Sequence, residues 1–592
     1  MQNASDSNST KRVSAWQLIK PYWVSDECGK AWILLIAIVA MNMGMVYLSY
    51  RLNVWNTRFY NVLADKDWRM FKSVMIEFSV IAFSLIAIAT VRITVRQTLE
   101  FGWRQWLTGR YLQQWLGHGS YYRIERDVLV DNPDQRIADD LQSLASNTLN
   151  LSLDLLSNVV SLITFAAVLW SLAGALAFSL AGHALVIPGY MLWAAAAYAL
   201  VGSWVMYKTN RPLVAINYQQ QRAEADFRFG LIRVRENAEQ IGFYRGEAAE
   251  QRGLGGRFGK IRENWQLIIK YSRRLTLVSS VYGQIALIFP IAVAAPRYFA
   301  GAYTIGVLFR IADAFGNVSD SLSWFVNNYT SLADWRATVN RLREFHRVTQ
   351  TASSPAPSPT DPTQTGASPS GVIARRLVAG KQLAVSDLSL SYPNGQPLAD
   401  IGSLHIAPGT RWLIEGPTGA GKSTLLRALA GLWQFGSGNI AVPSEAHMMF
   451  LPQRSYLPIG TLREALCYPS ATETVDDATL RAVLADVELA HYAPQLDESA
   501  HWERKLSLGE QQKLAFARVL LQHPDYVFLD EATSALDPAC ERRLYELLMA
   551  RLSQAAIISV GHRIALREFH VHRLDLGRQS GDANVEQLVK AV

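Results

Sequence analysis

The first half of the chain alternates long apolar runs with polar stretches. Six runs are long enough to cross a bilayer as a helix, which takes about 20 residues. They cover residues 32–50, 74–95, 152–173, 184–206, 275–296 and 302–329. The pattern predicts an all-α membrane domain of six transmembrane helices. Before it, residues 13–24 predict an amphipathic helix at the membrane surface, interrupted by Pro21.

The connections between these runs differ in length and charge. Residues 207–274 hold fourteen Lys and Arg against seven Asp and Glu. Basic loops favour the cytoplasmic side, which places the long loops and both termini there. Residues 51–72 argue the other way, with five basic and two acidic residues on the predicted outside. We keep this topology because an even number of spans returns the second half of the chain to the cytoplasm.

The sixth run carries polar residues at steps of three, four and seven. They are Arg310, Asp313, Asn317, Asp320 and Asn327. This spacing places them on one helix face, and ionisable groups facing lipid are costly. We expect the face to line a substrate cavity, with Arg310, Asp313, Asn317 and Asp320 as its residues. The alternative is that they hold the helices together by hydrogen bonds.

A change of composition divides the chain. Residues 349–372 are rich in Pro, Ser and Thr and lack apolar periodicity, which is typical of a linker. After it, short strand-like runs alternate with helical stretches, an α/β pattern. We expect an N-terminus with a surface helix (1–28), a membrane domain (29–346), a linker (347–377) and a C-terminal domain (378–592).

Composition narrows the class of protein. Half of the 592 residues are hydrophobic, which fits a membrane region, and a net charge of +7 is too modest to indicate nucleic-acid binding. Cys28, Cys467 and Cys540 are too scattered for a disulfide framework or a metal site. The polar residues 1–11 are not followed by the short apolar segment of a cleaved signal peptide.

The clearest chemical motif opens the C-terminal domain. Between an apolar run and a helix-like segment stands Gly416-Pro417-Thr418-Gly419-Ala420-Gly421-Lys422-Ser423-Thr424. Strand, glycine loop and helix form the context of a phosphate-binding P-loop. Its backbone N–H groups and the helix N-terminus attract a polyphosphate. Lys422 is expected to reach the β- and γ-phosphates, and Ser423 to hold Mg²⁺.

An acidic pair follows a second buried-strand pattern. Residues 525–529 run into Asp530 and Glu531, roughly 110 residues after the P-loop. Asp530 is placed to bind Mg²⁺, and Glu531 to polarise the attacking water. Acidic residues after a strand are a weak signal alone, and the preceding P-loop makes them a strong one.

Further segments resemble the motifs of ATP-binding cassette (ABC) proteins and occur in that family's order. Leu506–Gln512 resembles the signature motif and Ser534–Asp537 the D-loop. Gln453 resembles the Q-loop glutamine, His562 the switch histidine and Tyr392 the aromatic residue that stacks on adenine. The resemblance implies a P-loop ABC nucleotide-binding domain that uses ATP and Mg²⁺. His562 and Tyr392 also have plainer interpretations, as a structural histidine and a strand-end aromatic.

The resemblance implies roles for these residues. In the family two cassettes meet head to tail, so each ATP lies between the P-loop of one and the signature of the other. Besides the P-loop, it implies nucleotide contacts at Tyr392, Ser507, Gly509, Glu510 and Asp537. It implies catalytic roles for Glu531, His562 and Gln453. It implies Mg²⁺ ligands at Ser423, Gln453 and Asp530.

The membrane half resembles one branch of the family. The segments concerned are 52–61, 103–108, 132–137 and 227–239. They are similar to the BacA/SbmA-like bacterial inner-membrane proteins, in their ATPase-fused, YddA-type form, and to the related peroxisomal fatty-acyl half-transporters. One set of spans with one cassette implies a half-transporter that pairs with a second copy of itself, since both halves of its ATP site are intact. A heterodimer is the alternative.

Together these observations predict an ATP-driven transporter, an ATP hydrolase of a bacterial inner membrane with its ATP-binding domain in the cytoplasm. The expected cargo is hydrophilic, a cobalamin-like compound or a peptide. Two alternatives stay open: a lipid or fatty-acyl transporter, and a membrane ATPase that senses without transporting. Short coupling helices that touch the cassettes are expected near 127–142 and 218–240, although the charges there also suit solvated helix faces.

Replacing Arg235 or Glu236 is expected to uncouple ATP hydrolysis from transport, because both lie in the second predicted coupling segment. ATPase activity and cargo movement measured on the same preparation test this. Normal transport in these variants would contradict the prediction.

Overall fold

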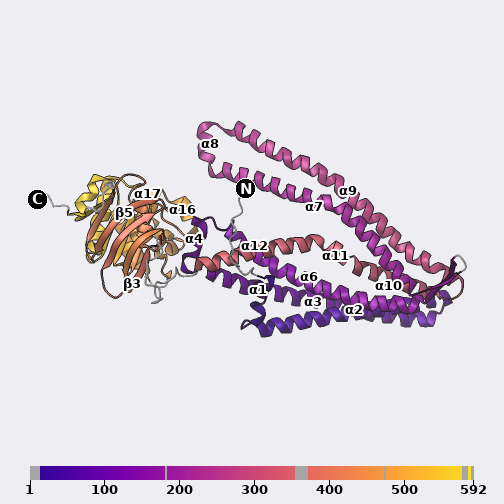
Figure 1. Cartoon of the computed structure of the whole chain (residues 1–592). Helices are drawn as coiled ribbons and strands as arrows, with labels where there is room; N and C mark the ends of the chain where they lie inside the picture. Colours follow the sequence, from indigo (N-terminus) through magenta and orange to yellow (C-terminus); the bar gives the residue numbers. More distant parts are fainter. Residues whose placement is uncertain (1–13, 181–182, 354–370, 473–474, 577–584, 588–592) are drawn as a thin grey trace. The chain divides into compact units, whose positions relative to one another are not determined.

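The computed structural model describes residues 14–180, 183–353, 371–472, 475–576 and 585–587 (Figure 1). The chain divides into two compact units, Met1–Ser354 and Pro355–Val592. Most of the expected linker lies outside the described residues. Regular structure occupies both of its ends, because a helix continues through Ser353 and a strand covers Ala374–Val378. Thr349 explains the helical end, since it is buried and donates a hydrogen bond to the Phe345 carbonyl, 2.7 Å away.

The first unit is built almost entirely of helices. In chain order they are α1 (Ala15–Ile19), η1 (Tyr22–Val24), α2 (Cys28–Asp65), α3 (Trp68–Leu116), η2 (Gly117–Gly119), α4 (Ser120–Arg126), α5 (Pro133–Gln135), the π-helical η3 (Arg136–Asp140), α6 (Leu141–Ala173), α7 (Tyr190–Glu236), α8 (Ala238–Tyr244), α9 (Glu247–Phe299), α10 (Ile305–Leu322), α11 (Trp324–Asn327) and α12 (Tyr329–Ser353). Helices α7 and α9 pack along each other and are joined by α8 (Figure 1).

Five of the described helical segments are long and apolar enough to cross a membrane. They are Cys28–Asp65, Trp68–Leu116, Pro133–Ala173, Tyr190–Glu236 and Glu247–Phe299. The sixth predicted span forms α10, which carries Arg310, Asp313 and Asp320 and is followed by the short α11. Its charges explain why it is not among the five. It nevertheless packs against α2, α6, α7 and α9.

The fourth predicted span begins later than expected. Residues 184–188 belong to strand β2 (His183–Pro188), which pairs antiparallel with β1 (Ala175–Leu180). Gly174 and Gly189 have φ angles of +63° and +59°, a conformation that helical residues do not adopt, so α6 ends before the first and α7 begins after the second. Residues 181–182, in the connection between the third and fourth predicted spans, lie outside the described residues.

The expected coupling segments also differ in position. Helix α7 continues unbroken to Glu236, and the short helix is α8, over 238–244 rather than 218–240. In the first segment, α5 and η3 lead directly into α6. The N-terminal helix α1 is present, and its apolar residues Leu18 and Ile19 are buried in a core that includes Trp103 of α3. In η1, which follows it, the Tyr22 ring stacks on Trp103 with centroids 5.7 Å apart.

The second unit contains two sheets. Its strands are β3 (Ala374–Val378), β4 (Leu383–Ser391), β5 (Pro397–Ile406), β6 (Arg411–Glu415), β7 (Gly436–Pro443), β8 (Met448–Leu451), β9 (Gly460–Thr461), β10 (Ser499–Ala500), β11 (Tyr526–Asp530), β12 (Ala556–Val560), β13 (His572–Asp575) and β14 (Val585–Gln587). The larger sheet has the order β14-β13-β6-β12-β11-β8, parallel except for β14. The smaller has the order β3-β7-β4-β5, and β9 pairs with β10.

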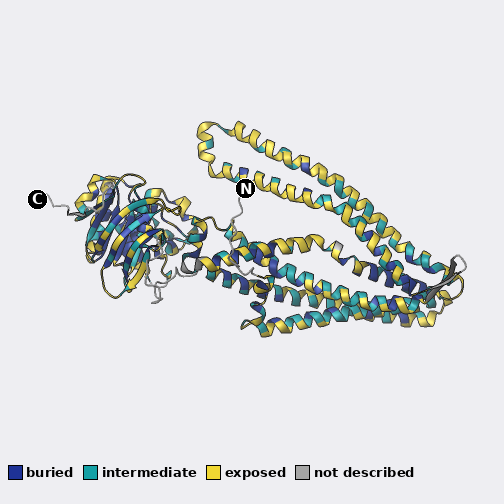
Figure 2. Cartoon of the chain, in the orientation of Figure 1, coloured by how far each residue is buried: buried dark blue, intermediate teal, exposed yellow. Residues whose placement is uncertain are grey.

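Helices lie on both faces of the larger sheet. They are α13 (Lys422–Leu429), α14 (Leu462–Cys467), α15 (Asp477–Asp486), η5 (Ala490–Gln495), α16 (Trp502–Lys505), α17 (Leu508–Gln522), α18 (Pro538–Arg551) and η6 (Ile564–Phe569). Strand side chains alternate between two cores. Val527 and Leu529 join the core with α14–α18, whereas Tyr526 and Phe528 join the core with α13 and the smaller sheet. Figure 2 shows the buried residues gathered in these strands and exposed residues along α7–α9. The predicted α/β domain is confirmed.

A buried hydrogen-bonded chain crosses one core of this unit. The His570 ring bonds to the Leu566 carbonyl through Nδ1 (2.6 Å) and to Ser559 Oγ through Nε2 (2.9 Å), and Tyr545 donates to the same Oγ (3.0 Å). Nδ1 must donate because a carbonyl only accepts, so Nε2 accepts in the neutral ring. Burial lowers the pKa of His570 to about 4.

His570 should therefore make this unit less stable in mild acid. The unfolded histidine, with a pKa of about 6.5, binds a proton at pH values where the folded ring stays neutral. The contribution of His570 to the free energy of unfolding is therefore fully present above pH 6.5 and is lost as the pH falls toward 4. Between pH 7 and 5 the loss should be about 2 kcal/mol. Hydrogen exchange of residues 556–560 in the full chain, corrected for intrinsic rates, measures it. His570→Gln should flatten the dependence and exposed His405→Gln should not; equal slopes in both would contradict the assignment.

Candidate functional site

The predicted P-loop connects β6 to α13. Gly416, Gly419 and Gly421 have φ angles of +145°, +84° and +91°, so the loop uses conformations that side chains disfavour. At Gly421 a Cβ atom would also lie 3.2 Å from Ala399 of β5. The β4–β5 hairpin is therefore packed against the loop. Tyr392 lies in the turn of that hairpin and is partly exposed, as an adenine-stacking residue must be.

Lys422 is held at the centre of the loop. Its side chain is 7% exposed, and Nζ donates to the carbonyls of Gly416 (2.6 Å) and Pro417 (2.8 Å). Burial lowers the pKa of Lys422, and the carboxylates of Glu531 and Asp530 act in the opposite direction. The lysine thus stands between the glycine loop and the acidic pair.

Asp530, the first residue of the acidic pair, lies beside the serine of the P-loop motif. Ser423 Oγ donates to Asp530 Oδ1 across 3.0 Å. A hydroxyl and a carboxylate are oxygen donors of the kind that Mg²⁺ takes, with phosphate oxygens and water completing its shell. The described residues contain no cluster of three or more His, Cys, Asp or Glu suited to a metal.

The three predicted catalytic residues lie together. Glu531 Oε2 accepts a hydrogen bond from Gln453 Nε2 (3.2 Å), and His562 Nε2 lies 3.6 Å from Glu531 Oε1. Glu531 has φ +50°, a conformation costly for a residue with a side chain, and its N–H donates to the Val560 carbonyl. Glu531 and His562 line a cavity of about 150 Å³. A carboxylate positioned between an amide and an imidazole suits activation of a water molecule.

The signature residues begin a helix. Ser507 is the N-cap of α17: its Oγ accepts from the Glu510 N–H, and Glu510 accepts from the Ser507 N–H at 2.8 Å. This capping box stabilises the helix end that can face an anion. Among the described residues, no hydrogen bond or ion pair joins Ser507, Gly509 or Glu510 to the P-loop. Asp537 likewise caps α18, accepting from the Ala539 and Cys540 N–H groups.

Two residues that connect these motifs were not singled out from the sequence. Gln512 is 1% exposed; its Nε2 donates to the Gln453 carbonyl (3.3 Å) and Ser534 Oγ (3.2 Å), and its Oε1 accepts from the Ala535 N–H (3.0 Å). Arg563 donates to the carbonyls of Ser534 and Leu536. They fix the D-loop against its neighbours. Their only sequence signal is their position, within or beside a motif.

The polar face of α10 meets another helix. Asn53 of α2 is fully buried; it donates to Asp313 Oδ2 (2.5 Å) and to the Arg310 carbonyl (3.1 Å), and it accepts from Arg310 Nε (3.0 Å). Asn317 donates to the Asp313 carbonyl in its own helix, and Asp320 is exposed. Two of the four predicted cavity residues therefore contact α2, which is the interhelical alternative, and Asp320 stays available.

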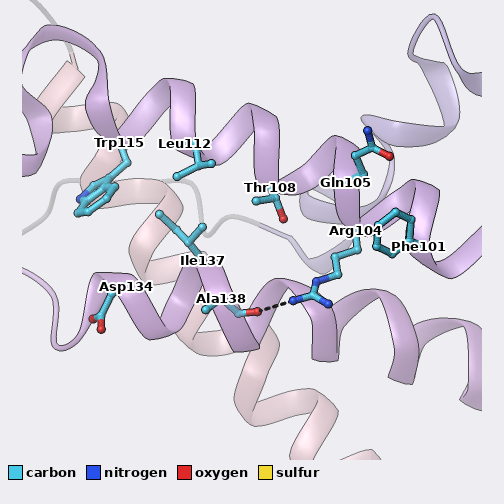
Figure 3. A pocket seen from close by; sticks show the side chains of 9 residues that line it. All are labelled: Phe101, Arg104, Gln105, Thr108, Leu112, Trp115, Asp134, Ile137 and Ala138. Carbon is cyan, nitrogen blue, oxygen red and sulfur yellow. Dashed lines mark hydrogen bonds between the residues drawn. The ribbon is translucent and has the colours of Figure 1, made fainter. Parts of the chain in front are cut away.

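Two segments noted for their family resemblance come together. Arg104 and Thr108 of α3 point toward Ile137 and Ala138 of η3 across a cavity of about 420 Å³, which Gln105 and Asp134 also line (Figure 3). Arg104 donates to the Ala138 carbonyl. At the end of η3, buried Asp140 accepts from Arg136 and from both Nε and Nη2 of Arg341 on α12. The predicted spans place both segments in the connection between the second and third runs, without indicating that they touch.

The sequence matches known protein families and relatives. Residues 18–299 match the family model "ABC transporter transmembrane region 2", and residues 400–534 match "ABC transporter". An uncharacterized ABC transporter ATP-binding protein of Synechocystis is 38% identical, over 92% of this chain and 79% of that protein. The Escherichia coli inner membrane ABC transporter ATP-binding protein YddA is 31% identical, over 92% and 94%. The human lysosomal cobalamin transporter ABCD4 is 26% identical, over 94% and 92%.

A solved structure shows the same fold. A bacterial Atm1-family ABC exporter with ATP bound matches with a TM-score of 0.72 and 17% identity, covering 93% of this chain and 95% of that one. The similarity to YddA, and to relatives named as D family ABC transporters, confirms the predicted relationship to those proteins. The BacA/SbmA-like grouping stays a prediction. The chain belongs to the ABC transporter family, as a half-transporter that fuses a transmembrane region to an ATP-hydrolysing domain.

Proposed function

We propose that this protein uses ATP hydrolysis to move a hydrophilic solute, such as a cobalamin-like compound or a peptide, across the inner membrane of a bacterium. One observation carries the proposal: Glu531 meets Gln453 and His562 beside the Ser423–Asp530 pair, in a chain that also has five membrane-length helices. ATP hydrolysis needs the group of residues around Glu531, and transport needs the membrane-length helices.

Within the ATP site each residue has a distinct task. Lys422 and the P-loop N–H groups neutralise phosphate charge, and Ser423 and Asp530, with Gln453, would hold Mg²⁺. The metal, when bound, offsets charge that develops on the phosphates. Glu531 accepts a proton from the attacking water, and His562 orients the water and the γ-phosphate. Tyr392 stacks on the adenine ring.

The site is completed by a second copy of the chain. The N-terminus of α17, with Ser507, Gly509 and Glu510, is shaped to bind an anion but has no bond to its own P-loop among the described residues. In a symmetric pair each P-loop meets the α17 N-terminus of the partner. Asp537 closes the D-loop segment and caps α18. Neither motif is degenerate, which supports a homodimer.

Placement and cargo are inferred from loop charge, from the relatives and from the polar residues of α10. The basic 207–274 loop supports a cytoplasmic ATP-binding domain, and the YddA relative is described as an inner-membrane protein. The cobalamin cargo of the ABCD4 relative supports the same class here. Polar Asp320 and Asn317 on α10 support a polar pathway rather than an apolar one.

Glu531→Gln should abolish hydrolysis and spare nucleotide binding. The amide cannot accept the water proton, and losses of about 10²–10⁴-fold are usual for a general base. ATPase turnover and ATP binding by the purified full chain in nanodiscs measure the two effects. Glu546→Gln, at an acidic residue of α18 outside the site, is the matched control. Turnover within a factor of two of the parent would contradict the role of Glu531.

Mixing two inactive variants should restore activity if the ATP site is shared between chains. Lys422→Ala disables a P-loop and Ser507→Ala a signature; in a mixed pair both defects fall in one site and leave the other intact. With free exchange of chains, about a quarter of parental ATPase should return, on the assumption of independent sites. A mixture as inactive as each variant alone would argue against the shared site.

A further inference from the structure

The membrane unit contains a cleft that the ATP chemistry does not use. It lies between α7 and the start of α12, with a volume of about 850 Å³. Its lining residues are Tyr207, Asn210, Arg211, Val214, Ala215, Tyr218, Gln219, Arg222, Phe325 and Tyr329. The rings of Tyr207 and Tyr329 meet edge to face, 6.2 Å apart, and join the two walls. The volume falls within the range of small-molecule sites, about 300–1,000 Å³.

The α7 wall is a single helix face. Arg211, Ala215, Tyr218 and Arg222 follow at steps of four, three and four, the spacing of one face. Arg211 and Arg222 are eleven residues apart, about 16 Å along the axis. Tyr218 therefore lies between two guanidinium groups.

The cleft is positively charged. None of its lining residues is acidic. Within the part of the chain that the structure describes, neither Arg211 nor Arg222 has a hydrogen bond or ion pair. Asp226 and Glu263 line the neighbouring cavity, which shares Arg222 but not Arg211. Guanidinium groups bind carboxylate and phosphate in paired, charge-assisted hydrogen bonds.

Aromatic faces complete the lining. Tyr218 is 70% exposed and Phe325 64% exposed, so their rings present free surface. The cleft begins at Tyr207, where the apolar part of α7 gives way to Lys208. An interfacial aromatic belt would account for Tyr207 and Tyr329. It does not account for two unpaired guanidinium groups and two amides on the same cleft.

We propose that this cleft binds the cargo and selects a soluble anion that carries a flat ring system. Arg211 and Arg222 hold its phosphate or carboxylate, and Tyr218 and Phe325 stack against the ring. Identification of the ligand as cargo rests on the proposed transport function. The positive charge, the length of the α7 face and the exposed rings together define the ligand class.

Two dyes with one ring system and opposite charge test the selection. Fluorescein is a planar anion, and rhodamine 6G carries a cationic version of the same xanthene ring. Fluorescence anisotropy with the full-length protein in phosphatidylcholine nanodiscs, without nucleotide, should show tighter binding of fluorescein. Arg211→Gln with Arg222→Gln should weaken the binding of fluorescein by about tenfold or more and should not weaken the binding of rhodamine 6G, because the two substitutions remove positive charge that repels a cation. Tyr218→Ala should weaken both dyes.

The control is Arg228→Gln, at an exposed arginine of α7 outside the cleft, which should change neither affinity. An unchanged elution profile and an unchanged thermal unfolding temperature of the double variant show that it is folded. Equal affinity for the two dyes, or no effect of the double variant, would overturn the proposal. Displacement of fluorescein by phosphatidylglycerol in the bilayer would also overturn it, in favour of a lipid site.

These outcomes separate the two proposals, because binding is measured without ATP. A protein that binds fluorescein at Arg211 and Arg222 but moves no solute would refute transport and leave an anion site. A protein that transports but shows no preference for the anionic dye would refute the cleft's selectivity alone.

Discussion

The parallel register of β6, β12 and β11 is the constraint on which the ATP site depends. Ile414 pairs with Val560, and Val560 pairs with Asp530, so three strands end at the same edge of the sheet. Each is followed directly by functional residues: the glycine loop after β6, His562 after β12 and Glu531 after β11. Contacts between residues more than a hundred positions apart, such as Ser423 with Asp530, follow from this arrangement. Loss of one strand would separate the nucleotide loop from its catalytic carboxylate.

The membrane unit resolves a different constraint, the cost of polar groups among apolar helices. Asn53, Arg310 and Asp313 satisfy one another between α2 and α10. Arg92 of α3 similarly donates to buried Asn42 of α2, 2.9 Å away. These bonds order the helices and leave fewer polar groups free to meet a solute. Arg211 and Arg222 differ from them, because neither has such a partner among the residues that the structure describes, and their guanidinium groups face a cleft.

The sequence predicted what depends on local pattern. Apolar strands, the glycine loop, the helix after it and the acidic pair were all assigned before their neighbours were known. It failed where a single residue or a distant one decides the outcome. Left-handed Gly174 and Gly189 admit a β hairpin where an apolar run suggested helix. Periodicity placed Arg310 and Asp313 on one face, yet only three-dimensional packing showed that Asn53 occupies that face. The Gln512 side chain makes hydrogen bonds to three residues that lie 22 to 59 positions away, and no sequence spacing indicates such a set of bonds.

The central claim is that hydrolysis at the shared ATP site drives a solute through the membrane unit. Inverted vesicles containing the full chain expose the ATP-binding domain, so labelled cobalamin or a labelled peptide can be followed across the membrane after ATP is added outside. The account predicts movement of label with ATP and none with a non-hydrolysable analogue at equal occupancy. Movement at the same rate with the analogue, or hydrolysis without any movement of either solute, would contradict it.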